Sequence, residues 1–364
     1  MLSRRHLLLA MGALAAPSRG AAVTFPDVVP RTLRFPEDLG AHPDFRSEWW
    51  YLTGWLGEST RPIGFQVTFF RVRTDVDPDN PSSFAAHQLV IAHAALADPA
   101  RGRLLLDERI ARTGFGLVQA ATGDTDVRLD GWSLARDAAT DSYRARIAAR
   151  DFTLDFTAVS QGPPWLQGNG GVSGKGPLPT QASYYYSRPQ LRVEAEISTR
   201  VAAVAAPTKM QGIAWLDHEW SSAALADNAA GWDWIGMNLD DGSALLAFQI
   251  RRQGAAPDET PLQRYAAFRH PDGSIRVVDP AAVRFSPLLN WTSTRSRAVW
   301  PIAQRIAVGG RVFETVPLMP DQELDSRLTT GAVYWEGAST LLEGGHPVGR
   351  GYLEMTGYVT PLRL

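Results

Sequence analysis

The sequence predicts an all-β fold. Twelve tryptophans accompany 32 glycines and 25 prolines. Aromatic side chains favour pleated sheets, whereas glycine and proline mark turns. Short runs of strand-forming residues alternate with turn signals such as Asp240-Asp241-Gly242 and Pro271-Asp272-Gly273, and long helical periodicity is hard to find. This pattern is typical of antiparallel sheets closed into barrels or packed as sandwiches.

The first element is an expected signal peptide over residues 1–22. Arg4 and Arg5 precede the apolar run 7–11, and residues 13–15 supply the small side chains of a cleavage site. A membrane anchor is the alternative, but about 20 apolar residues are needed to span a bilayer. The sequence therefore favours a cleaved signal of the twin-arginine type and a periplasmic protein. The chain contains no cysteine, so its stability depends on packing rather than disulfides.

Strand signals continue through the rest of the chain. About 340 residues remain after the signal, enough for two domains or one large one. The expected strands are 49–55, 63–73, 88–95, 143–158, 191–197, 244–251, 265–268 and 350–359.

A weak internal repeat supports two related units. An aromatic strand at 49–56 leads through a turn into a strand with a central Phe-Gln, and residues 232–250 follow the same plan. Chance similarity between hairpins is the competing explanation. The alanine-rich segment 201–207 is the best candidate for a join, which gives domains at 23–205 and 206–364. The glycine- and proline-rich stretch 161–180 is expected to be a long loop within the first unit.

The most informative segment is 215–220, of sequence WLDHEW, followed by GWDWIG at 231–236. If the first segment is a strand, its side chains alternate between two faces. One of these faces could line an apolar pocket that contains a titratable group. The two faces would carry Leu216, His218 and Trp220 on one side, and Trp215, Asp217 and Glu219 on the other.

Eight motifs, taken in order along the chain, resemble one known family. They are His42-Pro43, residues 48–51, 64–66, 93–96, 183–187, 217–220, 231–234 and 351–358. As an ordered set they extend over almost the whole mature chain and resemble the AttH-like, lipocalin-like family that includes the carotenoid 1,2-hydratases (hydroxyneurosporene synthases). The resemblance implies two lipocalin-like antiparallel β-barrel domains in tandem. Small barrels of this kind can enclose one apolar ligand.

The enzymes of that family add water to a terminal double bond of an acyclic carotenoid. This reaction needs an acid, a base and a pocket that tolerates a carbocation, which aromatic faces stabilise. The resemblance implies no metal, nucleotide or flavin cofactor. The residues expected to act as acids, bases or cation shields are Asp217, His218, Glu219 and Trp220, and those expected to bind the ligand are Trp50, Tyr185, Trp232, Trp234 and Phe248.

This chain departs from the family pattern at one place. The hydratases are thought to use a His-x-Trp pair, matched here by His218 and Trp220, together with a downstream Tyr-x-Asp pair. The equivalent strand offers Phe248 and Ile250, which carry neither a hydroxyl nor a carboxylate. Asp217, Glu219 or Asp233 would then have to substitute.

Each candidate also has a structural interpretation. Asp217 can form a salt bridge or cap a turn, His218 can be a hydrogen-bonded core residue, and the tryptophans can belong to the core. His87 and His93 would share one face of a strand, but a third metal ligand is not apparent nearby, so no metal site is expected.

Two classes of function therefore remain. A formal net charge of -2 without charge runs predicts no nucleic-acid partner. We expect an apolar small molecule, such as a lipid or a carotenoid or other isoprenoid, as the partner, with export or lipid-transport machinery as a further one. The first hypothesis is a periplasmic protein that binds or carries this molecule, and the second is a cofactor-independent hydro-lyase that acts on an isoprenoid double bond.

Overall fold

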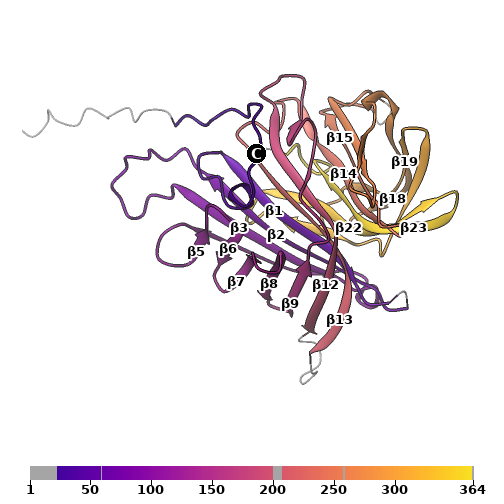
Figure 1. The fold of residues 1–364 in the computed structure, drawn as a ribbon, viewed down its shortest axis with the longest axis horizontal. Coiled ribbons are helices and arrows are strands. Elements are labelled where there is room, and N and C mark those ends of the chain that lie inside the picture. The colour runs from indigo at the N-terminus through magenta and orange to yellow at the C-terminus, as the bar shows by residue number, and fades with distance from the viewer. Residues whose placement is uncertain (1–22, 59, 200–206, 257–258, 363–364) are drawn as a thin grey trace, which may run out of the picture.

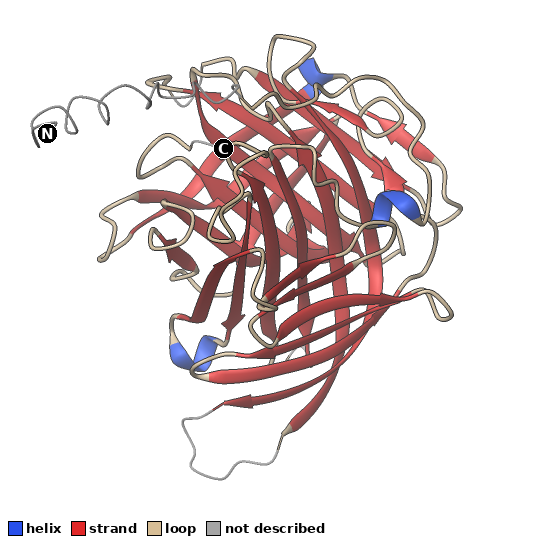
Figure 2. Ribbon diagram, turned by 90° about the vertical axis from the view of Figure 1, so that its left-hand side faces the viewer, coloured by secondary structure: helices blue, strands red, loops and turns tan. Residues whose placement is uncertain are grey.

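The computed structural model describes residues 23–58, 60–199, 207–256 and 259–362. The expected signal peptide lies outside these residues, as does most of the expected join at 201–207. Across the described residues the structure is built from β-strands, with three short 3-10 turns as its helical elements (Figures 1 and 2). No described helix combines the length and apolar character needed to cross a bilayer.

The strands of the described residues form two antiparallel sheets. The first sheet contains β1 (Ser47–Leu56), β2 (Ile63–Arg73), β3 (Gln88–Ala97), β4 (Leu104–Arg112), β5 (Val118–Ala120), β6 (Asp126–Leu129), β7 (Trp132–Asp137), β8 (Ser142–Ala148), β9 (Phe152–Val159), β10 (Trp165–Leu166), β11 (Val172–Gly174), β12 (Ala182–Thr199) and β13 (Thr208–Ser221). The second contains β14 (Ala229–Leu239), β15 (Ala244–Arg252), β16 (Gln263–Arg269), β17 (Ile275–Val277), β18 (Val283–Thr292), β19 (Val299–Val308), β20 (Arg311–Pro317), β21 (Glu323–Ser326), β22 (Ala332–Glu343) and β23 (His346–Thr356).

Each sheet curves almost completely round into a barrel. In the first, the initial strand β1 pairs with the final strand β13, and in the second β14 pairs with β23. The two edges of each sheet are consecutive strands of the described chain that do not pair with each other, β4 and β5 in one and β17 and β18 in the other. The expected all-β fold with two lipocalin-like barrels in tandem is confirmed.

The change from one sheet to the other comes between β13 and β14. β13 hydrogen-bonds to both β1 and β12, so the first sheet extends to Ser221. The boundary expected at 205/206 therefore falls between two neighbouring strands of the same sheet. The wide separation of β1 and β13 along the chain hides this pairing from local sequence patterns.

Most expected strands are present with shifted ends. The expected single strand 143–158 is instead a hairpin of β8 and β9, because Arg150 and Asp151 form a bend. The expected loop 161–180 contains two short strands, β10 and β11, that pair with β12.

The two strands of the expected internal repeat differ in how far the structure matches them. Tyr51 of β1 and Trp234 of β14 take corresponding positions, and both face the region between the barrels. Their partners on the next strand are Thr68 and Phe248. The Phe-Gln dipeptides that suggested the repeat are therefore out of register with each other.

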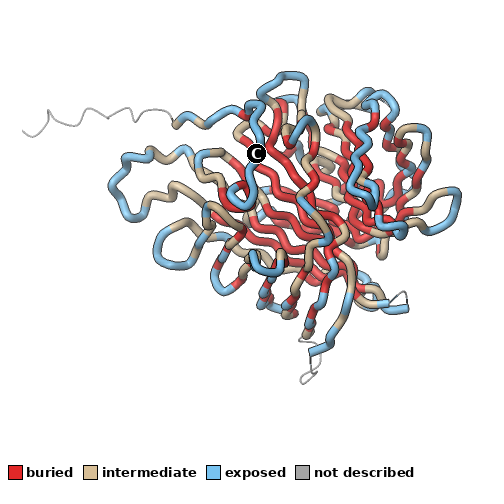
Figure 3. Tube along the Cα trace, viewed as in Figure 1, coloured by how far each residue is buried: buried red, intermediate tan, exposed pale blue. Residues whose placement is uncertain are grey.

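Buried side chains form a core inside each barrel and a further cluster between the barrels. Figure 3 shows that the buried residues lie mainly on the strands of the two sheets. Leu216 and Trp220 of β13 belong to the interior of the first barrel, whereas Trp215 belongs to the cluster between the barrels. The predicted alternation of residues 215–220 is confirmed. One face of β13 thus serves the first core, and the other faces the second barrel.

A buried ion network centred on Glu48 joins three other segments of the first barrel to β1. The carboxylate of Glu48, on β1, is hydrogen-bonded to three side chains. The distances are 2.7 Å to Nε of Arg71, 2.9 Å to Nε2 of His218 and 2.7 Å to Nδ1 of His42. His42 also contacts Asp38 at 2.9 Å through Nε2. Burial alone would raise the pKa of Glu48, but these partners hold it well below its usual range.

We expect Glu48→Ala to lower the free energy of unfolding by about 3–5 kcal/mol, because Arg71 would remain buried without its carboxylate. Urea titration measures this change. Glu196→Ala is the control: Glu196 lies on the exposed side of β12 and pairs with Lys209 across 3.4 Å. Equal losses in the two variants would contradict the structural role of the network.

Candidate active site between the two barrels

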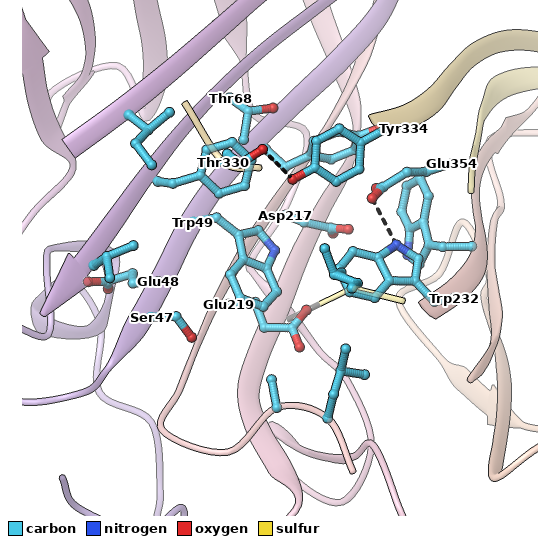
Figure 4. A pocket seen from close by; sticks show the side chains of 18 of the residues that line it. Ser47, Glu48, Trp49, Thr68, Asp217, Glu219, Trp232, Thr330, Tyr334 and Glu354 are labelled. Atoms are coloured by element: carbon cyan, nitrogen blue, oxygen red, sulfur yellow. Dashed lines mark hydrogen bonds between the residues drawn. The ribbon is translucent and has the colours of Figure 1, made fainter. Parts of the chain in front are cut away.

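A cavity of about 310 Å³ lies between the outer faces of the two barrels. Strands β1, β2, β3, β12 and β13 of the first barrel form one wall, and β14, β15, β22 and β23 of the second form the other. Figure 4 shows Trp49, Asp217 and Glu219 facing Trp232, Tyr334 and Glu354 across this space. Most of the lining side chains thus belong to the outer faces of the barrels, and Glu48 and Arg71 of the first barrel's buried network also border the cavity.

The register between β1, β13 and β12 determines which polar side chains of the first wall lie next to each other. Trp49 pairs with Glu219, and Tyr51 pairs with Asp217, across β1 and β13. Tyr185 of β12 lies beside Glu219 on the other side. Because residues two apart on a strand share a face, these side chains form two adjacent rows directed at the second barrel.

Asp217 accepts three hydrogen bonds. Its donors are the hydroxyls of Tyr185 and Ser187, each at 2.5 Å, and Nε1 of Trp215 at 2.7 Å. Burial nevertheless raises the pKa of Asp217 to about 7. The Tyr185 hydroxyl in turn accepts a hydrogen bond from Nε1 of Trp234 at 3.1 Å. Asp217 is thus held rigidly and links the aromatic groups of both walls.

Glu219 forms an ion pair with the one lysine of the cavity wall. Nζ of Lys175 lies 2.9 Å from Oε1 of Glu219, and both side chains are nearly buried. The same ammonium lies 4.7 Å from the ring centroid of Tyr185 and 4.3 Å from that of Phe248. Aromatic faces attract a cation that has lost its water.

Two further carboxyl groups face each other on the second wall. Glu336 of β22 and Glu354 of β23 are direct cross-strand partners, so their Cβ atoms lie roughly 4.5–5.5 Å apart. Tyr51 donates to Oε2 of Glu336 at 2.7 Å, and Nε1 of Trp232 donates to Oε1 of Glu354 at 2.8 Å. Among the described residues no donor bonds to the second oxygen of either group.

Near neutral pH at least one of the two carboxyls keeps its proton. Burial raises the pKa of Glu336 to about 7, and burial together with the Glu336 charge raises that of Glu354 well above its usual range. Two close carboxyls in a low dielectric cannot both ionise readily. One can therefore donate a proton while the other accepts one, which is the requirement for acid–base catalysis.

Six of the nine predicted site residues line the cavity. Asp217 and Glu219 come from β13, and Tyr185 from β12. The other three belong to the second wall: Trp232, Trp234 and Phe248. Ile250, which departs from the family pattern together with Phe248, also lines it.

His218, Trp220 and Trp50 face the interior of the first barrel instead. His218 stacks on Trp50 at 4.6 Å and binds Tyr186 and Glu48 through its two nitrogens. His42 stacks on Trp220 at 3.7 Å. The alternation of β13 separates His218 from Asp217, so the segment does not bring both to one site.

Asp233 also faces away from the cavity. It contacts Arg251 at 3.1 Å, and the Tyr358 hydroxyl donates to it at 2.9 Å. Asp233 therefore does not replace the missing Tyr-x-Asp pair.

The ring nitrogens of His42 and His218 and a Glu48 oxygen lie within 4.8 Å of one another, a grouping that could hold a metal. All four ring nitrogens already have hydrogen-bond partners, and the Arg71 guanidinium binds the same carboxylate. A cation next to the ligand carboxylate opposes a second cation. We interpret the group as a structural network.

Sequence reasoning missed the carboxyl pair and Lys175. Glu354 lies inside the 351–358 motif, so its carboxyl was visible, but its partner Glu336 lies in a segment without a recognised motif. Only the pairing of β22 with β23 brings the two together.

Comparisons with known proteins agree with this architecture. The AttH-like family model matches residues 26–358. A crystal structure assigned as an AttH from Nitrosomonas europaea is 52% identical, with a TM-score of 0.84, covering 92% of this chain and all (100%) of that one. No curated protein sequence matches the chain.

Two more distant structures share the fold. Kievitone hydratase from Nectria haematococca is 14% identical, with a TM-score of 0.66, over 92% of this chain and 98% of that chain. CghA is 13% identical, with a TM-score of 0.56, over 95% of this chain and 98% of that chain.

The raised pKa of Glu336 makes stability depend on pH. Its value of about 7 in the folded protein exceeds the ordinary value of 4.5, so its contribution is complete below pH 4.5 and is lost as the pH rises towards 7. Each pKa unit corresponds to about 1.4 kcal/mol. When the pH is raised from 5 to 8, we expect the free energy of unfolding of Glu336→Gln to fall by less than that of the wild type. Urea titration at each pH measures this difference.

Glu343→Gln is the matched control, because Glu343 lies on the same strand but pairs with Arg311 at 2.6 Å. Its pH dependence should follow that of the wild type over this range. Identical slopes for Glu336→Gln and the wild type would show that Glu336 ionises normally.

Proposed function

This chain belongs to the AttH-like family, and we propose that it binds an apolar, unsaturated molecule of the lipid or isoprenoid class between its barrels and catalyses hydration or dehydration there. The observation that carries the proposal is the Glu336–Glu354 pair. Two facing carboxyls with raised pKa values border an apolar, aromatic cavity. Buried acids of this kind destabilise a fold, and perturbed groups of this kind cluster at functional sites.

Hydration would proceed by two proton transfers. One carboxyl protonates the double bond, which leaves a carbocation on the more substituted carbon. Water then forms the new carbon–oxygen bond and loses a proton to the other, ionised carboxyl. A proton shift between the facing groups restores the starting state, and dehydration is the same sequence in reverse.

Aromatic rings on both walls suit the cationic intermediate. Trp49 lines one wall and Trp232 the other, and the ring of Trp234 packs edge-on against Tyr51 with centroids 5.6 Å apart. The attraction of a desolvated cation to such faces is about 2 kcal/mol. The shared fold of kievitone hydratase supports a hydratase class for this protein, although not its substrate.

A carrier is the second candidate. Phe248 and Ile250 stand where the family's hydratases are thought to have a Tyr-x-Asp pair, and most of the exposed cavity surface is apolar. A carrier would hold the same ligand without transforming it. We further propose that the protein is exported to the periplasm by the twin-arginine route, as residues 1–22 suggest, and receives its ligand at the membrane.

We expect Glu354→Gln and Glu336→Gln to reduce turnover by at least about 100-fold, which is the usual size of a general acid–base contribution. The assay follows the organic extract by mass spectrometry after incubation with acyclic isoprenoids. Glu343→Gln on the same strand should retain activity. Full activity in both carboxyl variants would remove the pair from the mechanism, while a ligand recovered unchanged with the wild type would indicate a carrier.

We also expect an isoprenoid tertiary amine to bind more tightly than the hydrocarbon of the same shape. The protonated amine imitates the carbocation, and the aromatic faces and carboxyls should together favour it by about tenfold or more. Quenching of tryptophan fluorescence measures both affinities. Equal affinities would argue against a cationic intermediate in this cavity.

A further inference from the structure

Lysine is rare in this chain. Only Lys175 and Lys209 occur among 36 basic residues, and the rest are arginine. Lys209 lies on the outer side of β13 with 82% of its side chain exposed. Lys175 is 7% exposed and lines the cavity between the barrels. This buried position is thus occupied by the compact ammonium group of a lysine rather than by the planar guanidinium group of an arginine.

The Lys175 ammonium has more donors than the protein satisfies. An ammonium carries three N–H donors and no acceptor. Among the described residues, Glu219 supplies the one oxygen within ion-pair distance of Nζ, at 2.9 Å. The other neighbours are the faces of Tyr185 and Phe248. The Lys175 ammonium therefore has N–H groups left that can donate a hydrogen bond to an oxygen of a ligand in the cavity.

The charge of the site restricts the kind of oxygen. Lys175 and Glu219 are neutral as a pair, so a ligand carboxylate would leave one net negative charge in a buried environment. Burial of an unpaired charge is costly. A neutral carbonyl oxygen accepts the hydrogen bond without adding charge.

We propose that Lys175 anchors the ligand by donating a hydrogen bond to a neutral carbonyl oxygen, such as that of a ketone or an ester, on an otherwise apolar molecule. Lys175 is a specificity-determining residue in this assignment, not a catalytic one. The inference rests on the proposed function only in identifying the cavity as the ligand site.

The anchor lies apart from the carboxyl pair. Phe248, against which the ammonium packs, pairs with Trp234, and Trp234 pairs with Glu354. Two strand spacings separate Phe248 from Glu354, roughly 10 Å. The carbonyl end of the ligand would therefore lie at Lys175, while a carbon–carbon bond farther along the molecule reaches Glu336 and Glu354.

The test compares three ligands with one acyclic isoprenoid skeleton: a methyl ester, the free acid and the hydrocarbon. Tryptophan fluorescence gives the dissociation constants. A hydrogen bond to a charged donor corresponds to about tenfold in affinity or more. We expect the ester to bind about tenfold more tightly than the hydrocarbon and more tightly than the acid at pH 8. Preference for the acid or the hydrocarbon would overturn the proposal.

Nitrogen-15 labelling of lysine supplies a readout that does not depend on activity. The protein has two Nζ signals, and the ester should shift that of Lys175 while leaving that of Lys209 in place. An unshifted Lys175 signal at saturating ester would also overturn the proposal. This result would leave the proposed acid–base function untouched, since that is tested by the Glu354→Gln and Glu336→Gln variants.

Lys175→Met combined with Glu219→Gln removes the anchor without leaving a buried charge. This double variant should lose the preference for the ester while it keeps its affinity for the hydrocarbon, which also reports an intact cavity. Lys209→Met is the control and should retain the wild-type preference. An ester preference that survives in the double variant would exclude Lys175 as the anchor.

Discussion

The first barrel depends on a single buried carboxylate, Glu48. Its oxygens are hydrogen-bonded to the guanidinium of Arg71 on β2, the imidazole of His218 on β13 and the imidazole of His42 in the N-terminal segment. These contacts hold the N-terminal segment, β2 and the much later strand β13 against β1. Because β1 and β13 are held in one register, Trp49, Tyr51, Asp217 and Glu219 all project from the opposite face towards the second barrel. The geometry of the cavity wall thus follows from a buried network whose Glu48 and Arg71 also border the cavity.

Buried acids take two forms in this molecule, and the difference lies in their partners. Glu48 has cations and donors on both oxygens, which keep it ionised. Glu336 and Glu354 have each other, one neutral donor apiece, and no cation among the described side chains that bond to them. The first arrangement stabilises a fold. The second keeps at least one proton near neutral pH and is suited to transferring it.

The sequence predicted the two-barrel fold, the alternation along residues 215–220 and six of the nine residues at the cavity, because these depend on local pattern and on the motifs of the family. It could not show which face of β13 is inside, since strand period alone leaves both faces equivalent. His218 and Trp220 were therefore placed in the site although they belong to the barrel interior. Glu336 was missed because its role depends on a partner on another strand. The hairpin at residues 143–158 and the boundary after β13 likewise depend on long-range pairing.

The proposed ligand site lies between two packed barrels, so that selection for binding could act on it separately from selection for folding. Substitutions at Phe248 or Ile250 alter the shape of the cavity without removing a side chain from the interior of either barrel, because these residues belong to the cluster between them. Such a surface can diversify quickly while both scaffolds stay unchanged. Related proteins with this architecture should accordingly differ most in the ligands they accept and least in the side chains that fill the barrel interiors.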